Sequence, residues 1–224
     1  MTYGVLFAAV AALLGSAALT LGGTGSALLW PALSFALVAA AYLGVGARVF
    51  GKRRDGTLAW ECATGLLPYL LLTWATWHLA RWVRREPPFH EIAPGLLVGR
   101  RLLPREMPAG VQTVVDLTAE FAEPRAVRRA GTYLCLPILD ASVPAEAELR
   151  ELLDRISRSP EPVYIHCAEG HGRTGLVAAA LLVRQGLAKD AEVALAALRR
   201  ARPGIGLKPA QRAFLEQVCR EACG

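Results

Sequence analysis

The stretch that decides the fold is Val163-Tyr-Ile-His-Cys-Ala-Glu-Gly-His-Gly-Arg-Thr-Gly175. Its first residues are apolar, as in a buried strand. After its last residues, apolar side chains recur with the spacing of a helix. A seven-residue loop, from Cys167 to Arg173, joins the two. A loop that enters a helix N-terminus directs several backbone N–H groups at one point, where the helix dipole adds partial positive charge. The stretch therefore predicts a cradle for a phosphate dianion.

The residue types in this loop suit nucleophilic attack on phosphorus. The positive field of the cradle favours the thiolate of Cys167, which is the reactive form of a cysteine. The planar fork of Arg173 can hold two phosphate oxygens at once. Gly170 and Gly172 let the backbone turn inward without a Cβ clash, and Thr174 can donate its hydroxyl to the sulfur when the sulfur leaves. The alternative is a chance Cys–Arg spacing around a structural cysteine, but strand, glycines and helix all favour the cradle.

This segment resembles the signature loop of the cysteine-dependent protein tyrosine phosphatase superfamily, in its dual-specificity branch. The resemblance covers roughly residues 92–222. Three other parts of the chain fit it. Val114-Val-Asp-Leu-Thr118 with Glu120 resembles the second strand and its turn, Leu136-Pro-Ile-Leu-Asp140 resembles the approach to the general-acid loop, and Ala201-Arg-Pro-Gly204 with Pro209-Ala-Gln-Arg212 resembles the late loop and last helix.

The resemblance implies an α/β fold, with a central sheet flanked by helices, and a reaction in two displacements through a phosphocysteine. No cofactor and no metal is expected, because Arg173 and the loop amides neutralise the transferring group. The expected phosphate-binding residues are Ala168, Glu169, Gly170, His171, Gly172 and Arg173. Asp140, in an Asp-Ala-Ser-Val-Pro loop, is our choice for the general acid. The alternative for it is a loop aspartate that caps the next helix. Asp116, the competing carboxylate, is interpreted as structural.

Other side chains have roles that only the resemblance suggests. His166 would hold the loop and tune the thiol from behind. Gln211 would position the hydrolytic water, although an ordinary exposed helix residue is the alternative. Cys135 is interpreted as a plain core cysteine, and a protective disulfide with the nucleophile, as in some relatives, is the alternative. Relatives that act on highly phosphorylated inositol lipids often carry lysine where this loop has Glu169 and His171, so a multiply charged substrate is disfavoured.

Three apolar runs precede this domain, at 3–21, 27–50 and 58–80. Each is close to the roughly 20 residues that cross a bilayer as a helix. Trp74, Trp77 and Trp82 near the end of the third run suit an interfacial aromatic belt. The alternative is buried helices of a soluble protein. We therefore expect a transmembrane region of about three helices at 1–85, a linker at 86–91 and a catalytic domain at 92–224.

The alternation of patterns predicts a set of strands and helices in the second half of the chain. The expected strands are 96–98, 111–117, 132–138 and 162–166, and the expected helices are 124–130, 145–157, 174–185, 191–200 and 209–222.

The formal net charge is +6. Residues 1–90 hold seven basic and three acidic residues, which gives +4, and residues 91–224 hold eighteen and sixteen, which gives +2. The excess therefore lies beside the apolar runs, where it suits anionic membrane lipids. No basic stripe with interleaved aromatics occurs, which argues against nucleic acid as a partner.

The five cysteines show no paired framework, which favours a reducing compartment. We expect a multi-pass membrane protein, in the inner membrane if the source is a bacterium, with its catalytic domain in the cytosol. Basic clusters at 48–54 and 81–85 flank opposite ends of the third run, so the orientation stays open. Glu61 in that run either reaches the headgroups or takes part in substrate binding.

Together these patterns predict a membrane-anchored phosphatase that hydrolyses phosphate monoesters. The substrate would be a protein carrying phosphotyrosine, phosphoserine or phosphothreonine, or else a phospholipid. One alternative is a phosphatase specific for lipid phosphates, of the phosphatidylglycerophosphate or phosphoinositide type. A minor alternative is an inactive phosphate-binding module.

Overall fold

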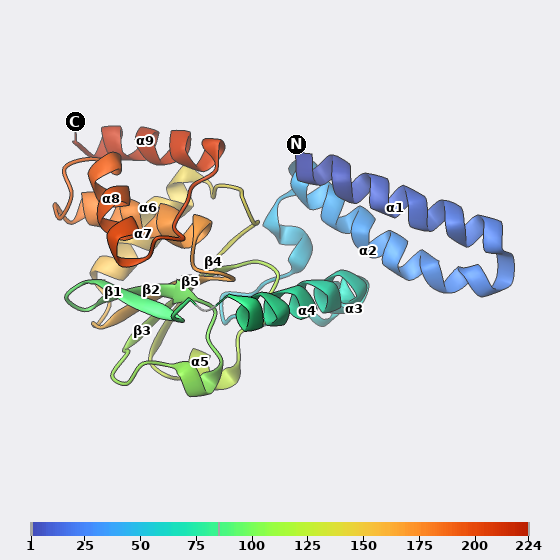
Figure 1. Ribbon diagram of the computed structural model, residues 1–224, viewed down its shortest axis with the longest axis horizontal. Coiled ribbons are helices and arrows are strands. Elements are labelled where there is room, and N and C mark those ends of the chain that lie inside the picture. Colours follow the sequence, from blue (N-terminus) through green and yellow to red (C-terminus); the bar gives the residue numbers. More distant parts are fainter. Residues whose placement is uncertain (1, 85, 224) are drawn as a thin grey trace. The chain divides into compact units, whose positions relative to one another are not determined.

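The computed structural model describes residues 2–84 and 86–223, with side chains described to residue 220 (Figure 1). The chain divides into two compact units. The helical unit comprises residues 2–53, 57–84 and 119–122, and the sheet unit comprises residues 54–56, 86–118 and 123–223.

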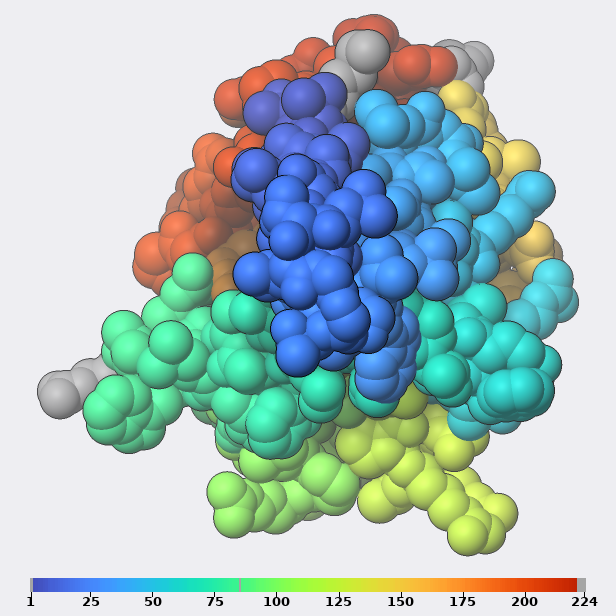
Figure 2. All heavy atoms as spheres, turned by 90° about the vertical axis from the view of Figure 1, so that its right-hand side faces the viewer, coloured from blue at the N-terminus to red at the C-terminus, as the bar shows by residue number. Residues whose placement is uncertain are grey.

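The helical unit begins with two helices that fold back on each other. α1 (Thr2–Leu21) is followed by a tight 3-10 turn (Gly22–Leu28) and by α2 (Leu29–Ala40). The two helices lie side by side in both views, as Figure 2 shows for the blue segments facing the viewer. Between the helices of this unit the ring of Phe7 packs against Phe35 and Tyr69, at centroid distances of 6.0 and 5.6 Å. These aromatic contacts stabilise the packing of the helices in this unit.

The third apolar run differs from the single helix expected at 58–80. It forms two helices, α3 (Trp60–Gly65) and α4 (Leu67–Val83), with a break at Leu66. Pro68 explains the break, because proline lacks a backbone N–H and is tolerated only in the first turn of a helix. Glu61 is exposed in the first turn of α3, where its charge complements the helix dipole.

One helical stretch in the described chain, Thr2–Val45, is long and apolar enough to cross a membrane by length and composition. The mean hydropathy of its most apolar window is 2.2, and only 11% of that window is buried within the protein. The stretch contains the 3-10 turn after α1 and a π-helical turn at Ala41–Val45. The expectation of three separate membrane-spanning helices therefore stays a prediction.

The sheet unit is built on a mixed five-stranded sheet in the order β1-β2-β5-β3-β4. Its strands are β1 (Phe89–Ala93), β2 (Leu96–Arg100), β3 (Thr113–Thr118), β4 (Thr132–Ile138) and β5 (Val163–Cys167). β1 runs antiparallel to β2, and all the other pairs are parallel. The middle strand is thus β5, which comes directly before the predicted cradle.

Helices cover both faces of this sheet (Figure 1). The longer helices, α6 to α9, lie on one face, and the short α5 lies on the other. Their bounds are α5 (Arg125–Arg128), α6 (Glu146–Ser157), α7 (Gly172–Arg184), α8 (Ala191–Ala201) and α9 (Pro209–Cys223), with a 3-10 turn at Pro104–Glu106.

Side chains alternate between two cores along the inner strands, as the period of a strand requires. On β5, Val163 and Ile165 enter the core beneath α6–α9, whereas Tyr164 joins the smaller core on the opposite face. On β2, Val98 likewise enters the core beneath α6–α9, and Leu97 joins the smaller core. This alternation fixes the register of the sheet and thereby the end of β5 from which the loop departs.

The α/β fold with a sheet flanked by helices is confirmed, and each predicted strand and helix of this unit exists within a few residues. One strand was missed. The expected linker at 86–91 overlaps β1, which begins at Phe89. The two prolines before Phe89 obscured the short strand, because proline is typical of connections rather than of paired backbone.

Candidate active site

Cys167 is the last residue of β5, and its side chain is buried, with 3% of its surface exposed. The backbone N–H of Gly170 donates to its sulfur at 3.3 Å. This contact shows that the loop does curl around the thiol and directs an amide at it. A thiolate gains more from such a donor than a thiol, because a charge-assisted hydrogen bond is the stronger one.

The curl of the loop depends on Gly170. Its φ of 74° lies in the left-handed region, where residues with a Cβ are strained. A Cβ here would also lie 2.2 Å from the carbonyl carbon of Gly99 on β2. Because both atoms in that clash belong to backbone, the loop and the strand can approach this closely only with glycine at position 170.

Arg173 lies in the first turn of α7 and is almost fully buried. One of its terminal nitrogens donates to the carbonyl oxygen of Ile138 at 2.9 Å, and the other lies 3.4 Å from a carboxylate oxygen of Asp140. The side chain of Asp140 is 68% exposed. The structure therefore brings the predicted acid next to the predicted phosphate-gripping arginine, at the open side of the loop.

Thr174 and Gln211 are both fully buried. The hydroxyl of Thr174 has no hydrogen-bond partner within the described chain, so its donation to the sulfur stays a prediction. The amide of Gln211 donates to the carbonyl of Ser142 at 3.1 Å and accepts the N–H of Lys208. The alternative of an exposed helix residue is therefore wrong for Gln211, which contacts the loop that carries Asp140.

His166 is buried behind the cradle and stacks on Tyr164 at a centroid distance of 5.5 Å. The Tyr164 hydroxyl donates to the carbonyl oxygen of Arg100 on β2. Burial raises the pKa of Tyr164 well above its usual value, so this phenol remains a neutral donor. The placement fits a supporting role for His166 and gives it no direct access to solvent.

A buried polar cluster, formed by Asp116, Glu123 and His166, places one potential metal-binding atom from each residue within 4.8 Å of the others. The carboxylate oxygens of Asp116 already accept hydrogen bonds from Thr118 and from the Tyr133 hydroxyl, the latter at 2.6 Å. Glu123 forms an ion pair with Arg101 at 2.9 Å. The carboxylates of Asp116 and Glu123 are thus engaged within the protein, and the structural role of Asp116 stays a prediction.

Comparison with known proteins agrees with this geometry. Residues 105–187 match the family model described as "Tc-R-P: Polymorphic toxin system, DSP-PTPase phosphatase". A curated relative, the putative tyrosine phosphatase 197R of invertebrate iridescent virus 6, is 37% identical over 83 residues, which cover 33% of this chain and 31% of the relative. This chain therefore spans about a third of the length of that relative.

Solved structures extend the likeness over the whole sheet unit. The structure of Tk-PTP in its active form is 27% identical, has a TM-score of 0.53 and covers 60% of this chain and 97% of its own. PTPMT1 in complex with PI(5)P is 23% identical, with a TM-score of 0.53, over 61% of this chain and 97% of its own. Human DUSP28 is 21% identical, with a TM-score of 0.53, over 62% of this chain and 97% of its own.

The sheet unit is therefore similar to the dual-specificity branch of the cysteine-dependent protein tyrosine phosphatases, with the family model matching residues 105–187. We call it the phosphatase domain below. The named relatives are phosphatases, which as a class are phosphoric monoester hydrolases. The matched segment begins in the 3-10 turn before β3 and ends just after α7, so it contains Cys167 and the loop that follows it.

A disulfide between Cys135 and the nucleophile does not fit the phosphatase domain. Leu134 and Leu136, on either side of Cys135 on β4, enter the core that also contains Cys167. Cys135 therefore points to the opposite face of the sheet, and it forms no disulfide in the described chain. Two cysteines whose Cβ atoms point apart cannot be bridged without backbone movement.

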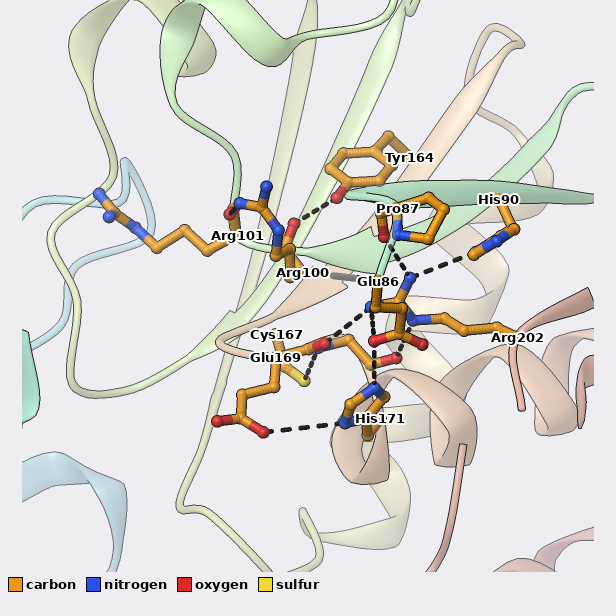
Figure 3. Close-up of polar contacts among 11 residues, drawn as sticks. Glu86, Pro87, His90, Arg100, Arg101, Tyr164, Cys167, Glu169, His171 and Arg202 are labelled. Carbon is orange, nitrogen blue, oxygen red and sulfur yellow. Dashed lines mark hydrogen bonds and ion pairs between the residues drawn. The ribbon is translucent and has the colours of Figure 1, made fainter. Parts of the chain in front are cut away.

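The side of the signature loop opposite the sulfur is held by Arg202 and Glu86, for which the sequence predicted no role in the site (Figure 3). Arg202, fully buried after α8, donates to the carbonyl oxygens of Glu169 and Gly170 at 3.0 Å each. Glu86 accepts from Arg202 at 2.9 Å and lies 2.8 Å from a ring nitrogen of His171. No local signal could reveal this cluster, because Glu86 and Arg202 are 116 positions apart.

Proposed function

We propose that this protein is a membrane-anchored, cysteine-dependent phosphatase that hydrolyses phosphate monoesters through a phosphocysteine intermediate. One observation carries the proposal. The thiol of Cys167 ends the central strand inside a loop whose amide at Gly170 is aimed at the sulfur, with the buried guanidinium of Arg173 beginning the next helix.

In the first displacement the Cys167 thiolate attacks phosphorus. A sulfur–phosphorus bond forms, the bond from phosphorus to the ester oxygen breaks, and Asp140 gives its proton to the departing oxygen. Arg173 and the loop amides neutralise the charge on the three equatorial oxygens, as preorganised donors do in phosphoryl transfer.

In the second displacement water attacks the phosphocysteine. The Asp140 carboxylate takes a proton from that water, the sulfur–phosphorus bond breaks, and inorganic phosphate leaves. The Thr174 hydroxyl would stabilise the departing thiolate, since a buried hydroxyl without another partner is ready to donate. Gln211 would hold the loop that carries Asp140 through its bond to Ser142.

The apolar surface of the helical unit supports a membrane location. Large side chains on α1 are open to the surroundings, among them Leu6 at 56%, Leu13 at 71% and Leu19 at 81% exposure. Contiguous exposed apolar surface of this kind marks contact with lipid or with another apolar body. A cradle tethered at a membrane would meet lipid phosphates and the phosphorylated parts of membrane proteins.

The charges at the mouth of the loop favour a substrate with a single phosphate group. The side chain of Glu169 is 41% exposed, so its carboxylate places negative charge at the rim of the loop. A second phosphate on the substrate would meet this carboxylate, and like charges disfavour each other. We therefore rank lipid or protein monophosphates above multiply phosphorylated headgroups.

The decisive experiment is a substrate panel with full-length protein in detergent. Phosphopeptides carrying phosphotyrosine, phosphoserine or phosphothreonine are compared with phosphatidylglycerophosphate, mono- and polyphosphorylated phosphoinositides, and an aryl phosphate. We expect release of inorganic phosphate from at least one monophosphate, and a reduction of roughly a thousandfold or more in Cys167→Ser, because the nucleophile is lost.

The matched control is Cys135→Ser, which changes a cysteine on the other face of the sheet and should keep activity within about twofold. Full activity in Cys167→Ser, or none in the wild type with any member of the panel, would contradict the proposed function.

A further inference from the structure

The outer side of the signature loop is held by one buried arginine. Nε of Arg202 donates to the carbonyl oxygen of Gly170, and a terminal nitrogen donates to that of Glu169, both at 3.0 Å. The same guanidinium also donates to the carbonyl of Pro87 and to Nδ1 of His90. Figure 3 shows Arg202 reaching the loop from the side opposite the sulfur.

These two bonds determine where the loop amides point. A trans peptide unit is planar, so its carbonyl and the N–H of the following residue point in opposite directions. Holding the Glu169 carbonyl outward therefore turns the Gly170 N–H inward, and that N–H is the one that donates to Cys167. Holding the Gly170 carbonyl outward turns the N–H of His171 inward in the same way.

Glu86 completes the contact from the segment that follows α4. A single oxygen of its carboxylate, Oε2, lies 2.9 Å from Arg202 and 2.8 Å from Nε2 of His171. Arg202 is 0% exposed, and Glu86 is 25% exposed. A buried guanidinium without a counter-charge is strongly unfavourable, so the Glu86 carboxylate compensates the charge of Arg202 at the loop.

The backbone at Gly204 packs against the contact between Glu86 and His171. A Cβ at that position would lie 2.4 Å from Nε2 of His171 and 3.1 Å from the second carboxylate oxygen of Glu86. The backbone φ of Gly204 is not in the left-handed region, so an added methyl group would act through contact with these side chains.

We propose that Glu86 is a positioning residue for the phosphatase reaction, acting through Arg202 and His171 to keep the amides of the signature loop directed at the phosphate. This inference rests on the proposed function and deepens it. It makes the short segment after α4 part of the catalytic apparatus, although Glu86 touches neither the substrate nor the sulfur.

The first test compares Glu86→Gln with Glu106→Gln in full-length protein. Glu106, in the 3-10 turn after β2, forms an ion pair with Arg100 that is similarly exposed. We expect Glu86→Gln to lower kcat/KM for an aryl phosphate about tenfold and to weaken inhibition by inorganic phosphate, because misplaced donors bind both the phosphate and the transition state less well. Glu106→Gln should stay within about twofold of the wild type.

The second test disturbs the contact between Glu86 and His171 without removing the Glu86 carboxylate. Gly204→Ala inserts a methyl group against His171, whereas Gly206→Ala adds the same group where nothing lies within 4 Å. We expect Gly204→Ala to lower kcat/KM and to weaken phosphate inhibition, and Gly206→Ala to change neither. The double variant Glu86→Gln/Gly204→Ala should lose less than the product of the two single effects, since both act on one contact.

Melting temperatures of all the variants separate positioning from simple destabilisation. Unchanged kcat/KM and unchanged phosphate inhibition in both Glu86→Gln and Gly204→Ala would overturn the inference, while the wild type remained active. Absence of turnover in the wild type would contradict the proposed function instead, and binding of inorganic phosphate by calorimetry would still decide the role of Glu86.

Discussion

Asp140 is the residue that we propose as the general acid of this domain. It lies at the exposed end of the loop after β4, 3.4 Å from Arg173, and is open to an incoming ester. Because the guanidinium contacts both this carboxylate and the carbonyl of Ile138, it can organise the acid and the phosphate together.

Asp140→Asn should reduce kcat by about 10²- to 10³-fold for alkyl phosphates, the range in which general acids contribute. The loss should be much smaller for p-nitrophenyl phosphate, whose leaving group needs no proton. Rates across pH 5 to 8 for both substrates provide the measurement. Asp154→Asn, which removes a partner of Arg184 at the surface, is the control. Equal losses with the two leaving groups would refute this role for Asp140.

At the residue scale, the sequence predicted the site residues that are adjacent in the chain. Cys167, Arg173 and the loop glycines follow one another, so their joint geometry is contained in a short motif. The burial of Gln211 could not be predicted, because the amide is covered by a loop some seventy residues earlier in the chain. Glu86 was missed for the same reason, since its partners come from the far end of the domain.

At the scale of an element, β1 carries a histidine, His90, whose pKa is lowered in the folded domain. His90 accepts a hydrogen bond from Arg202 at Nδ1, and Glu86 lies nearby. Burial lowers the pKa of His90 below 6.5, the charge of Arg202 lowers it further, and Glu86 opposes the shift. The folded domain therefore favours the neutral imidazole.

The sign of the pH effect follows from this direction. Below pH 6.5 the unfolded chain binds a proton at His90 more readily than the folded chain, so acid favours unfolding. The stabilising contribution is complete above the unfolded pKa and is lost as the pH falls through the folded pKa. We expect the wild type to lose more free energy of unfolding between pH 7.5 and pH 5.5 than His90→Gln, whose amide oxygen can still accept from Arg202.

Denaturant unfolding at the two pH values measures that difference. Identical losses in the wild type and the variant would contradict the assignment.

Helices and strands could be predicted where their apolar side chains recur at a regular spacing. The strand at 132–138 was predicted with the bounds that β4 has, because its alternation is regular. β1 was not recognised, since five residues beside two prolines give too short a pattern. The third apolar run was read as one helix because hydropathy does not register the interruption that Pro68 causes.

At the scale of the whole molecule, the exposed leucines of α1 predict strong association with lipid. Full-length protein should float with phospholipid vesicles and resist an alkaline wash. Leu13→Asp should weaken this association by roughly 100-fold, since a carboxylate at the centre of an apolar helix costs about 2.5 to 3.5 kcal/mol on insertion.

The control is Leu187→Asp, which changes a leucine that is 61% exposed in the phosphatase domain. Flotation that is equally impaired in both variants would argue against α1 as the membrane-binding element.

The central position of β5 has a further consequence. Its neighbours β2 and β3 are both distant along the chain, since Leu96 pairs with Val163 and Thr113 pairs with the same residue. The nucleophile strand therefore joins the sheet only after long loops have closed, which is typical of slow-folding topologies. Once formed, its amides should exchange with deuterium only through global opening. We therefore expect β5 to be among the most protected strands of the domain, and the loop around Cys167 to be among the last parts to form on refolding.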